Sequence, residues 1–353
     1  MRIHVTELIE GDKLSNDTFN TYGLHVLSKG TQLKEKEIAT LLRHQIDYVD
    51  VDARHADTTE VPFRTIESGI SPRWLPAVEP IYQDAINGCE QLFLEAFQNG
   101  KIDEDDVVQT FQPLVDNFRM ERDVVSMLLL LNTKDDYTYQ HSVQVGMLAY
   151  FLASWLDYGE EEAVKIGQAG FLHDIGKCRI QEGILNKPDK LSSEEYESIK
   201  LHTIYGHQII TESFGESLAS IVALEHHERV DGSGYPNRLT GEDMHPVSKI
   251  IAVADVYSAM ISSRVYQKKR DLLYVLKELH RMSFSELDAH TTHTFIKHMI
   301  PNFIGKQVEL ENGEVGTIIM THATEFFCPL IRIDDRFVDL SVERQLQIMH
   351  VYM

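Results

Sequence analysis

Cysteine is scarce in this chain of 353 residues, and its three cysteines are far apart in the sequence. Cys89, Cys178 and Cys328 form no CxxC pair, so the sequence predicts neither a disulfide framework nor a zinc site built from thiolates. Any metal site would have to use nitrogen and oxygen ligands.

Long apolar segments are also missing. The N-terminus contains charged residues from position 2 and has no apolar stretch typical of a secretion signal. The longest apolar run, at 124–131, is far shorter than the roughly 20 residues that a membrane-spanning helix needs. These features predict a cytoplasmic protein without membrane insertion.

Basic residues are outnumbered, with 33 Lys and Arg against 55 Asp and Glu and a net charge of −22. Binding to a long nucleic acid requires clustered cations that release counterions, so this composition argues against such a partner. It leaves open a small anionic ligand held by a local basic patch.

The hydrophobic content of 43% allows a sizeable core, and the length favours two or three domains. Hydrophobic periodicity predicts a mostly α fold. We expect a small α/β N-terminal module at 1–55, a linker at 56–75, a helical domain at 76–301 and a β-rich C-terminal extension at 302–353. Within the helical domain, Ser192 and Glu195 form a predicted capping box, and Gly176 is expected to end a helix.

Histidine is the compositional exception, with 17 residues. His141 lies in a helical pattern on the same face as Val145 and Leu148, so it is expected to point into the core. Alternatively, His141 is a core histidine that forms hydrogen bonds within the protein and binds no metal. His173 and Asp174 lie together at a predicted helix end among apolar residues, where an unpaired carboxylate would be costly.

Asp255 is the only acidic residue in the apolar helical segment KIIAVADVYSAMI. It could cap a neighbouring helix, but histidines close by would favour a metal. His202 shares a helical face with apolar residues, whereas His207 points elsewhere and is not assigned a role. His226 and His227 are adjacent, which suits two ligands at a helix end, because consecutive helical residues diverge by about 100°.

Imidazole and carboxylate ligands suit Fe, Mn, Ni or Zn, and a set this large favours two divalent metal ions over one. Lys177 follows the HDIG segment and is expected to contact a phosphate oxygen or the leaving group. A solvated surface lysine is the alternative.

The segments HDIGK at 173–177 and HHERVDGSGYP at 226–236, with His141, His202 and Asp255, resemble the HD-GYP family of metal-dependent phosphohydrolases. The resemblance covers about 120–300. It implies an all-helical HD-type catalytic domain, a centre that often contains iron, and hydrolysis of cyclic dinucleotides, chiefly cyclic di-GMP. By position, it implies seven metal ligands with Asp174 as the bridging one: His141, His173, Asp174, His202, His226, His227 and Asp255.

The same resemblance implies that Gly234, Tyr235 and Pro236 line the substrate pocket and that Arg264 contacts the substrate. Two positions depart from the family pattern. Tyr137 stands where members with a third metal have Glu, which predicts a dinuclear centre. Gln267 stands where a second basic residue is common, so the sequence does not indicate how the second nucleotide is held.

The resulting expectation is a phosphodiesterase that uses two metal ions and an activated hydroxide to convert cyclic di-GMP to pGpG. Fe or Mn is expected in preference to Ni or Zn, and further cleavage to GMP is left open. Hydrolysis of cyclic GMP-AMP is one alternative. A second alternative is a receptor that binds a cyclic dinucleotide without turnover. A third, a general HD nucleotidase, is disfavoured by the GYP segment. A homodimer or a signalling protein partner is left open.

Overall fold

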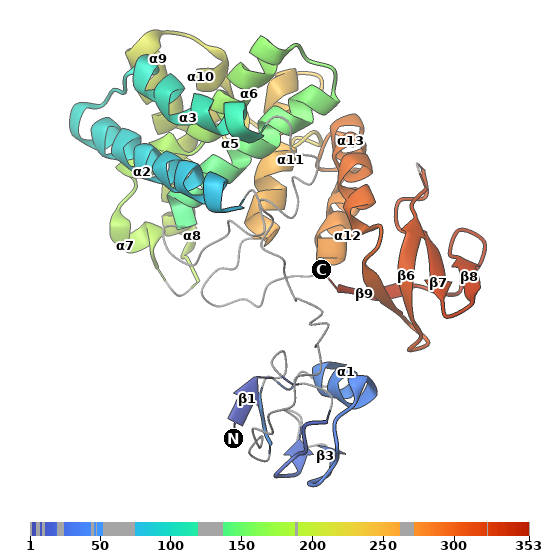
Figure 1. Ribbon diagram of the computed structural model, residues 1–353. Coiled ribbons are helices and arrows are strands. Elements are labelled where there is room, and N and C mark those ends of the chain that lie inside the picture. Colours follow the sequence, from blue (N-terminus) through green and yellow to red (C-terminus); the bar gives the residue numbers. More distant parts are fainter. Residues whose placement is uncertain are drawn as a thin grey trace. The chain divides into compact units, whose positions relative to one another are not determined.

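The computed structural model describes residues 2–4, 8, 11–19, 25–43, 46, 48–51, 75–118, 137–187, 190–261, 272–322 and 324–352. The chain divides into two compact units, Met1–Gly69 and Ile70–Met353 (Figure 1). The predicted linker at 56–75 lies almost entirely outside the described residues, so its boundaries stay a prediction.

The first unit is a small mixed α/β module. It contains β1 (Arg2–His4), β2 (Thr18–Phe19), β3 (His25–Leu27), α1 (Glu35–Arg43) and β4 (Tyr48–Asp50). β1 pairs antiparallel with β4, and β2 pairs antiparallel with β3. The β2–β3 pair was not predicted from the sequence. A separate small core contains Leu8, Leu14, Leu33, Leu41, Ile46, Val49 and Val51.

The second unit begins with helices. They are α2 (Leu75–Asn99), α3 (Glu104–Phe118), α5 (Tyr137–Trp155), α6 (Glu160–Leu172), the 3₁₀ helix η2 (Ile175–Arg179), α7 (Glu182–Leu185), α8 (Ser193–Lys200), α9 (His202–Phe214), α10 (Leu218–Glu225), α11 (Pro246–Ile261), α12 (Leu272–Met282) and α13 (Ala289–Met299). α5 packs along α6 and α11, and its residues from Gln140 to Ala153 are all buried. Polar side chains on α5 therefore have to find partners inside the protein.

The predicted capping box is present: Ser192 Oγ accepts from Glu195 N, and the Glu195 carboxylate accepts from Ser192 N. The helix that it starts was expected to continue past His202, but it is divided into α8 and α9 at Leu201. His202 consequently starts a new helix.

The prediction that Gly176 ends a helix was wrong. α6 already ends at Leu172, and Gly176 lies inside η2. A Cβ at Gly176 would overlap with the backbone of His202 and Gly206, so glycine allows η2 to approach α9 closely.

The C-terminal part is a five-stranded antiparallel sheet that follows the short 3₁₀ helix η3 (Ile300–Phe303). Its strands are β5 (Gln307–Leu310), β6 (Val315–Met320), β7 (Leu330–Ile333), β8 (Arg336–Asp339) and β9 (Ile348–Tyr352), in the order β8-β7-β6-β5-β9. Its buried residues continue the hydrophobic core of the helices. The predicted mostly α fold with a small C-terminal sheet is confirmed. Within the described residues, no helix is both long and apolar enough to span a bilayer.

Candidate metal centre

Asp174 lies between the end of α6 and the start of η2 and is buried. Its Oδ2 atom is 3.2 Å from His173 Nε2, and its Oδ1 atom is 3.3 Å from His202 Nε2 and 3.7 Å from His226 Nε2. The carboxylate therefore presents its two oxygens to imidazoles that come from opposite sides.

His141 on α5 and Asp255 on α11 approach the same point from two central helices. His141 Nε2 is 3.0 Å from Asp255 Oδ1 and 3.9 Å from Asp174 Oδ2. His227, just after α10, has its Nδ1 atom 3.7 Å from Asp255 Oδ2. The structure thus brings together the seven residues that the resemblance implied as ligands. Their role as ligands remains a prediction.

Backbone carbonyls fix the tautomers of three of the imidazoles. The Nδ1 atoms of His173, His202 and His226 donate to Gly170 O at 2.7 Å, Ile199 O at 2.6 Å and Ala223 O at 3.0 Å, respectively. Each Nδ1 therefore carries the proton, and each Nε2 presents a lone pair to the centre.

His141 is oriented by side chains that the sequence did not indicate. Ser258 Oγ donates to Gln144 Oε1 at 3.0 Å, so the serine oxygen accepts from His141 Nδ1 at 3.0 Å. The Nε2 lone pair of His141 then faces the Asp255 carboxylate. Such outer contacts commonly fix the orientation of metal-binding histidines.

Burial is the largest influence on the pKa of most of these groups. It lowers the pKa of His226 and His227 well below 6.5 and that of His202 to about 4. Burial alone would raise the pKa of the Asp174 carboxyl, but nearby His173 and Lys177 lower it well below its ordinary value. Burial also opposes the charged form of His173, but the adjacent Asp174 outweighs it and raises the pKa of His173. At neutral pH, the centre therefore combines neutral imidazoles of His202, His226 and His227 with an ionised Asp174 carboxylate, which is the state of these groups that binds a metal.

The contacts within the centre fit a cation. His202 Nε2 and His226 Nε2 are 3.2 Å apart, although both carry lone pairs. Among the residues that the structure describes, none forms a hydrogen bond with the buried His173 Nε2 or Asp174 Oδ1 atom. Two lone pairs facing each other and two unpartnered buried acceptors are costly in a protein interior unless a positive charge lies among them.

The possible ligand atoms form two groups that share Asp174. One group is Asp174, His202, His226 and His227, and the other is His141, His173 and Asp174. Within each group, the ligand atoms lie within 4.8 Å of one another. This arrangement fits two cations that share one carboxylate, and nitrogen with oxygen ligands suits Fe, Mn, Ni or Zn.

Lys177 lies beside the centre, with its Nζ atom 2.5 Å from Asp174 Oδ2. The lysine is partly exposed, whereas Asp174 is buried. Its ammonium group therefore lies between the centre and solvent, where an anion would approach.

The GYP segment forms a loop against the end of α10. The ring of Tyr235 is 4.7 Å from the ring of His227, and Pro236 follows Tyr235 in a cis peptide. A Cβ at Gly234 would overlap with the backbone of Glu228 and Arg229, so only glycine allows this approach. Gly234 and Tyr235 thus lie next to His227, and the role of Gly234, Tyr235 and Pro236 as pocket residues remains a prediction.

Glu228 holds this loop and was missed in the sequence, although it belongs to the HHERVDGSGYP segment. It is fully buried, and its carboxylate accepts from Asn237 N at 2.6 Å and Leu239 N at 3.0 Å. An acidic residue directly after the two histidines was the available signal. Arg264 and Gln267 lie outside the described residues, as does the side chain of Tyr137.

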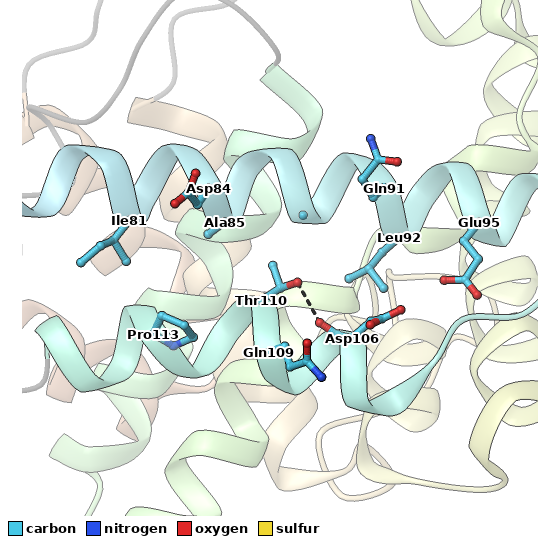
Figure 2. Close-up of a pocket in the computed structure, with 11 residues that line it drawn as sticks. Ile81, Asp84, Ala85, Gln91, Leu92, Glu95, Asp106, Gln109, Thr110 and Pro113 are labelled. Atoms are coloured by element: carbon cyan, nitrogen blue, oxygen red, sulfur yellow. Dashed lines mark hydrogen bonds between the residues drawn. The ribbon is translucent and has the colours of Figure 1, made fainter.

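A groove with a volume of about 490 Å³ lies elsewhere, between α2 and α3. Figure 2 shows Leu92 and Glu95 from α2 pointing toward α3, which carries Asp106 and Thr110. The residues around it include no histidine. We therefore assign the candidate chemistry to the buried His and Asp cluster.

Known proteins support this assignment. Residues 124–291 match the family model of the HD domain. A cyclic di-GMP phosphodiesterase of Pseudomonas aeruginosa is 33% identical over 207 residues, which cover 58% of this chain and 50% of that protein. A cyclic di-GMP phosphodiesterase of Thermotoga maritima is 36% identical over 177 residues, covering 48% of each chain.

The 3'3'-cGAMP-specific phosphodiesterase 1 of Vibrio cholerae is 35% identical over 177 residues, covering 49% of this chain and 41% of that protein. The chain therefore spans about half the length of the curated relatives that it matches. Residues 124–291 thus resemble the HD domain family, and the predicted resemblance to the HD-GYP branch is confirmed.

Proposed function

We propose that this protein hydrolyses a phosphodiester bond of cyclic di-GMP and releases linear pGpG, with further cleavage to GMP left open. The observation that carries the proposal is the pair of Nε2 lone pairs of His202 and His226, 3.2 Å apart beside the unpartnered Oδ1 atom of Asp174. The names of two relatives point to the same substrate.

We further propose that the seven His and Asp side chains would hold two divalent cations, with Asp174 shared between the two groups of ligands. Fe or Mn is preferred to Ni or Zn as the identity of these cations. When bound, such cations neutralise the charge of phosphate oxygens and make a water molecule a stronger nucleophile. The protein residues orient the imidazoles, keep Asp174 ionised and place Lys177 beside the phosphate. Lys177 can donate a proton or a hydrogen bond to the leaving oxygen.

Tyr235 would contact the substrate from the loop that Glu228 and Gly234 hold against α10. Burial raises the pKa of its phenol, so Tyr235 stays protonated and can act as a hydrogen-bond donor at neutral pH. Gly234 and Pro236 would form the adjoining wall. Arg264, which lies outside the described residues, is proposed from the family resemblance alone to contact the substrate as well.

Cyclic GMP-AMP is a second candidate substrate, because a relative of comparable identity is specific for 3'3'-cGAMP by name. We place either reaction in the cytoplasm, and a homodimer or a signalling protein partner remains a prediction.

The test is to purify the protein without oxygen, load it with Fe²⁺ or Mn²⁺, and incubate it with cyclic di-GMP or 3'3'-cGAMP. Chromatography of the products should show pGpG with the wild type and none with Asp174→Asn, which keeps the side-chain shape but loses the charge. Faster cleavage of 3'3'-cGAMP would favour the second candidate. Tight binding of both dinucleotides without product would instead identify a receptor.

A further inference from the structure

A lysine lies between two tyrosine rings next to the metal centre. Lys200 is the last residue of α8, and its Nζ atom is 4.7 Å from the ring centroid of Tyr196 and 5.4 Å from that of Tyr235. Both distances are within the range of a cation–π contact. Tyr196 comes from α8 and Tyr235 from the GYP loop, so the three side chains join two elements that are distant in sequence.

This cluster borders the accessible edge of the centre. The ring of Tyr235 is 4.7 Å from that of His227 and 6.5 Å from that of His202. The side chain of His227 is 21% exposed, whereas those of His202 and His226 are fully buried. A substrate that reaches the centre on the His227 side would therefore pass over Tyr235.

Lys200 is held only weakly by other charges. Its anionic partner in the described part of the chain is Glu197, at 2.6 Å, and the glutamate side chain is 68% exposed. An exposed pair at this spacing is weak, so a phosphate can displace the glutamate.

Other basic groups around the centre are more firmly engaged. Lys177 pairs with the buried Asp174, and Arg229 donates to the carbonyls of His226 and Glu228. Lys200 contacts the Tyr235 ring of the GYP loop, and its pairing with the exposed Glu197 leaves it able to bind a second anion.

A cyclic dinucleotide presents two phosphodiesters and two bases, and one phosphodiester is cleaved at a time. The remaining nucleotide needs a cation for its phosphate and an aromatic surface for its base. We propose that Tyr196, Lys200 and Tyr235 form the subsite for this second nucleotide. Lys200 contacts its phosphate, and Tyr196, whose side chain is exposed, stacks on its base. This assignment rests on the proposed phosphodiesterase function.

The test compares full-length, metal-loaded wild type with Lys200→Ala on two substrates. Cyclic di-GMP has a second nucleotide, whereas bis(p-nitrophenyl) phosphate is a diester without one. We expect KM for cyclic di-GMP to rise about tenfold, the effect of losing one charge-assisted hydrogen bond, while kcat changes little. Hydrolysis of the small diester and metal content should stay unchanged.

Lys297→Ala is the matched control, because it removes the same charge from an exposed position on α13. Tyr196→Leu should raise KM for cyclic di-GMP, and Tyr196→Phe should restore it, since the aromatic face is kept. Calorimetry with metal-free protein provides a readout without turnover: Kd for cyclic di-GMP should also rise about tenfold in Lys200→Ala.

The two proposals fail in different ways. If the wild type cleaves neither diester after metal loading, the proposed function is wrong, and the calorimetric comparison still tests the subsite. If Lys200→Ala matches the wild type in both KM and Kd for cyclic di-GMP, the subsite is wrong even when the enzyme is active. An equal loss of activity on both substrates would also overturn it, because the defect would then lie in the centre itself.

Discussion

The imidazoles of His173, His202 and His226 are each anchored on Nδ1 by a backbone carbonyl. His141 differs because its anchor is a side chain, Ser258, which is in turn bonded to Gln144. Backbone carbonyls cannot be removed by substitution, but the serine hydroxyl can. The orientation of His141 is therefore the part of the centre most open to a mutational test.

Ser258→Ala should weaken metal binding about 10- to 100-fold, the usual effect of removing a group that orients a metal-binding histidine. Titration with Mn²⁺ followed by electron paramagnetic resonance measures this affinity. Ser258→Thr keeps the hydroxyl and should recover most of it. Ser248→Ala is the control, because Ser248 is buried on the same helix but its hydroxyl has no hydrogen-bond partner. Equal affinity in Ser258→Ala and the wild type would contradict this role.

The metal-free protein should lose stability in mild acid. Burial, opposed by Asp174, lowers the pKa of His202 from 6.5 to about 4. As the pH falls between these values, the unfolded chain gains a proton at His202 that the folded protein does not, so the free energy of unfolding decreases. The contribution is constant above pH 6.5, and its loss by pH 4 is worth about 3 kcal/mol.

Urea unfolding of chelator-treated wild type and His202→Gln at pH 7.5 and 4.5 measures this effect. The stability of the variant should fall less between the two pH values. An equal fall in both proteins would show that His202 does not stay neutral in the folded state.

The sequence predicted the candidate ligands better than the groups that hold them. His173, Asp174, His226 and His227 belong to short segments whose order is itself distinctive. Ser258 contacts His141 across 117 positions, and no local pattern marks such a contact. Lys200 and Tyr196 were missed for the same reason, since their contact with Tyr235 depends on how α8 packs beside the GYP loop.

At the scale of helices, the approach of η2 to α9 positions Asp174 against His202. Gly176 makes this approach possible, so its importance was predicted from the sequence but for the wrong reason. A glycine that ends a helix is recognised from the backbone conformation of its own segment. Gly176 is instead needed because the backbone of α9 lies too close to leave room for a Cβ. For the same reason, the division between α8 and α9 at Leu201 was not predicted.

Gly176→Ala should force η2 away from α9, because the added methyl group would overlap with His202 O and Gly206 N. We expect a loss of about 1–3 kcal/mol of stability, typical of overpacking, and weaker binding of Mn²⁺. Gly183→Ala is the control, since a Cβ there meets nothing within 4 Å. Urea unfolding and metal titration check both variants, and a Gly176→Ala protein as stable as Gly183→Ala would refute the close-packing role.

At the scale of the molecule, the N-terminal unit has a hydrophobic core of its own, whereas the C-terminal sheet shares the core of the helices. The core of Met1–Gly69 shares no residue with the core of Ile70–Met353. The C-terminal sheet, in contrast, continues the helical core, and Lys277 Nζ donates to Ile348 O at 3.3 Å. Periodicity predicted the sheet, but strand patterns alone could not show that it shares a core with the helices.

Deletion of residues 1–69 should therefore leave metal content and the thermal midpoint of the remaining unit nearly unchanged. Deletion of residues 305–353 should lower that midpoint and favour aggregation, because core residues such as Val308 and Ile331 would be removed. Differential scanning calorimetry compares the two truncated proteins. A large loss of metal in the first deletion would mean that the N-terminal unit supports the centre.

The central claim is that two cations share Asp174, since this residue belongs to both groups of ligand atoms. The most direct test is inductively coupled plasma mass spectrometry of wild type and Asp174→Asn after anaerobic reconstitution with Fe²⁺ or Mn²⁺. The wild type should bind about two metal ions per chain, as expected of a two-metal site, and the variant should lose both. A wild type without metal, or a variant with the same metal content as the wild type, would contradict the claim.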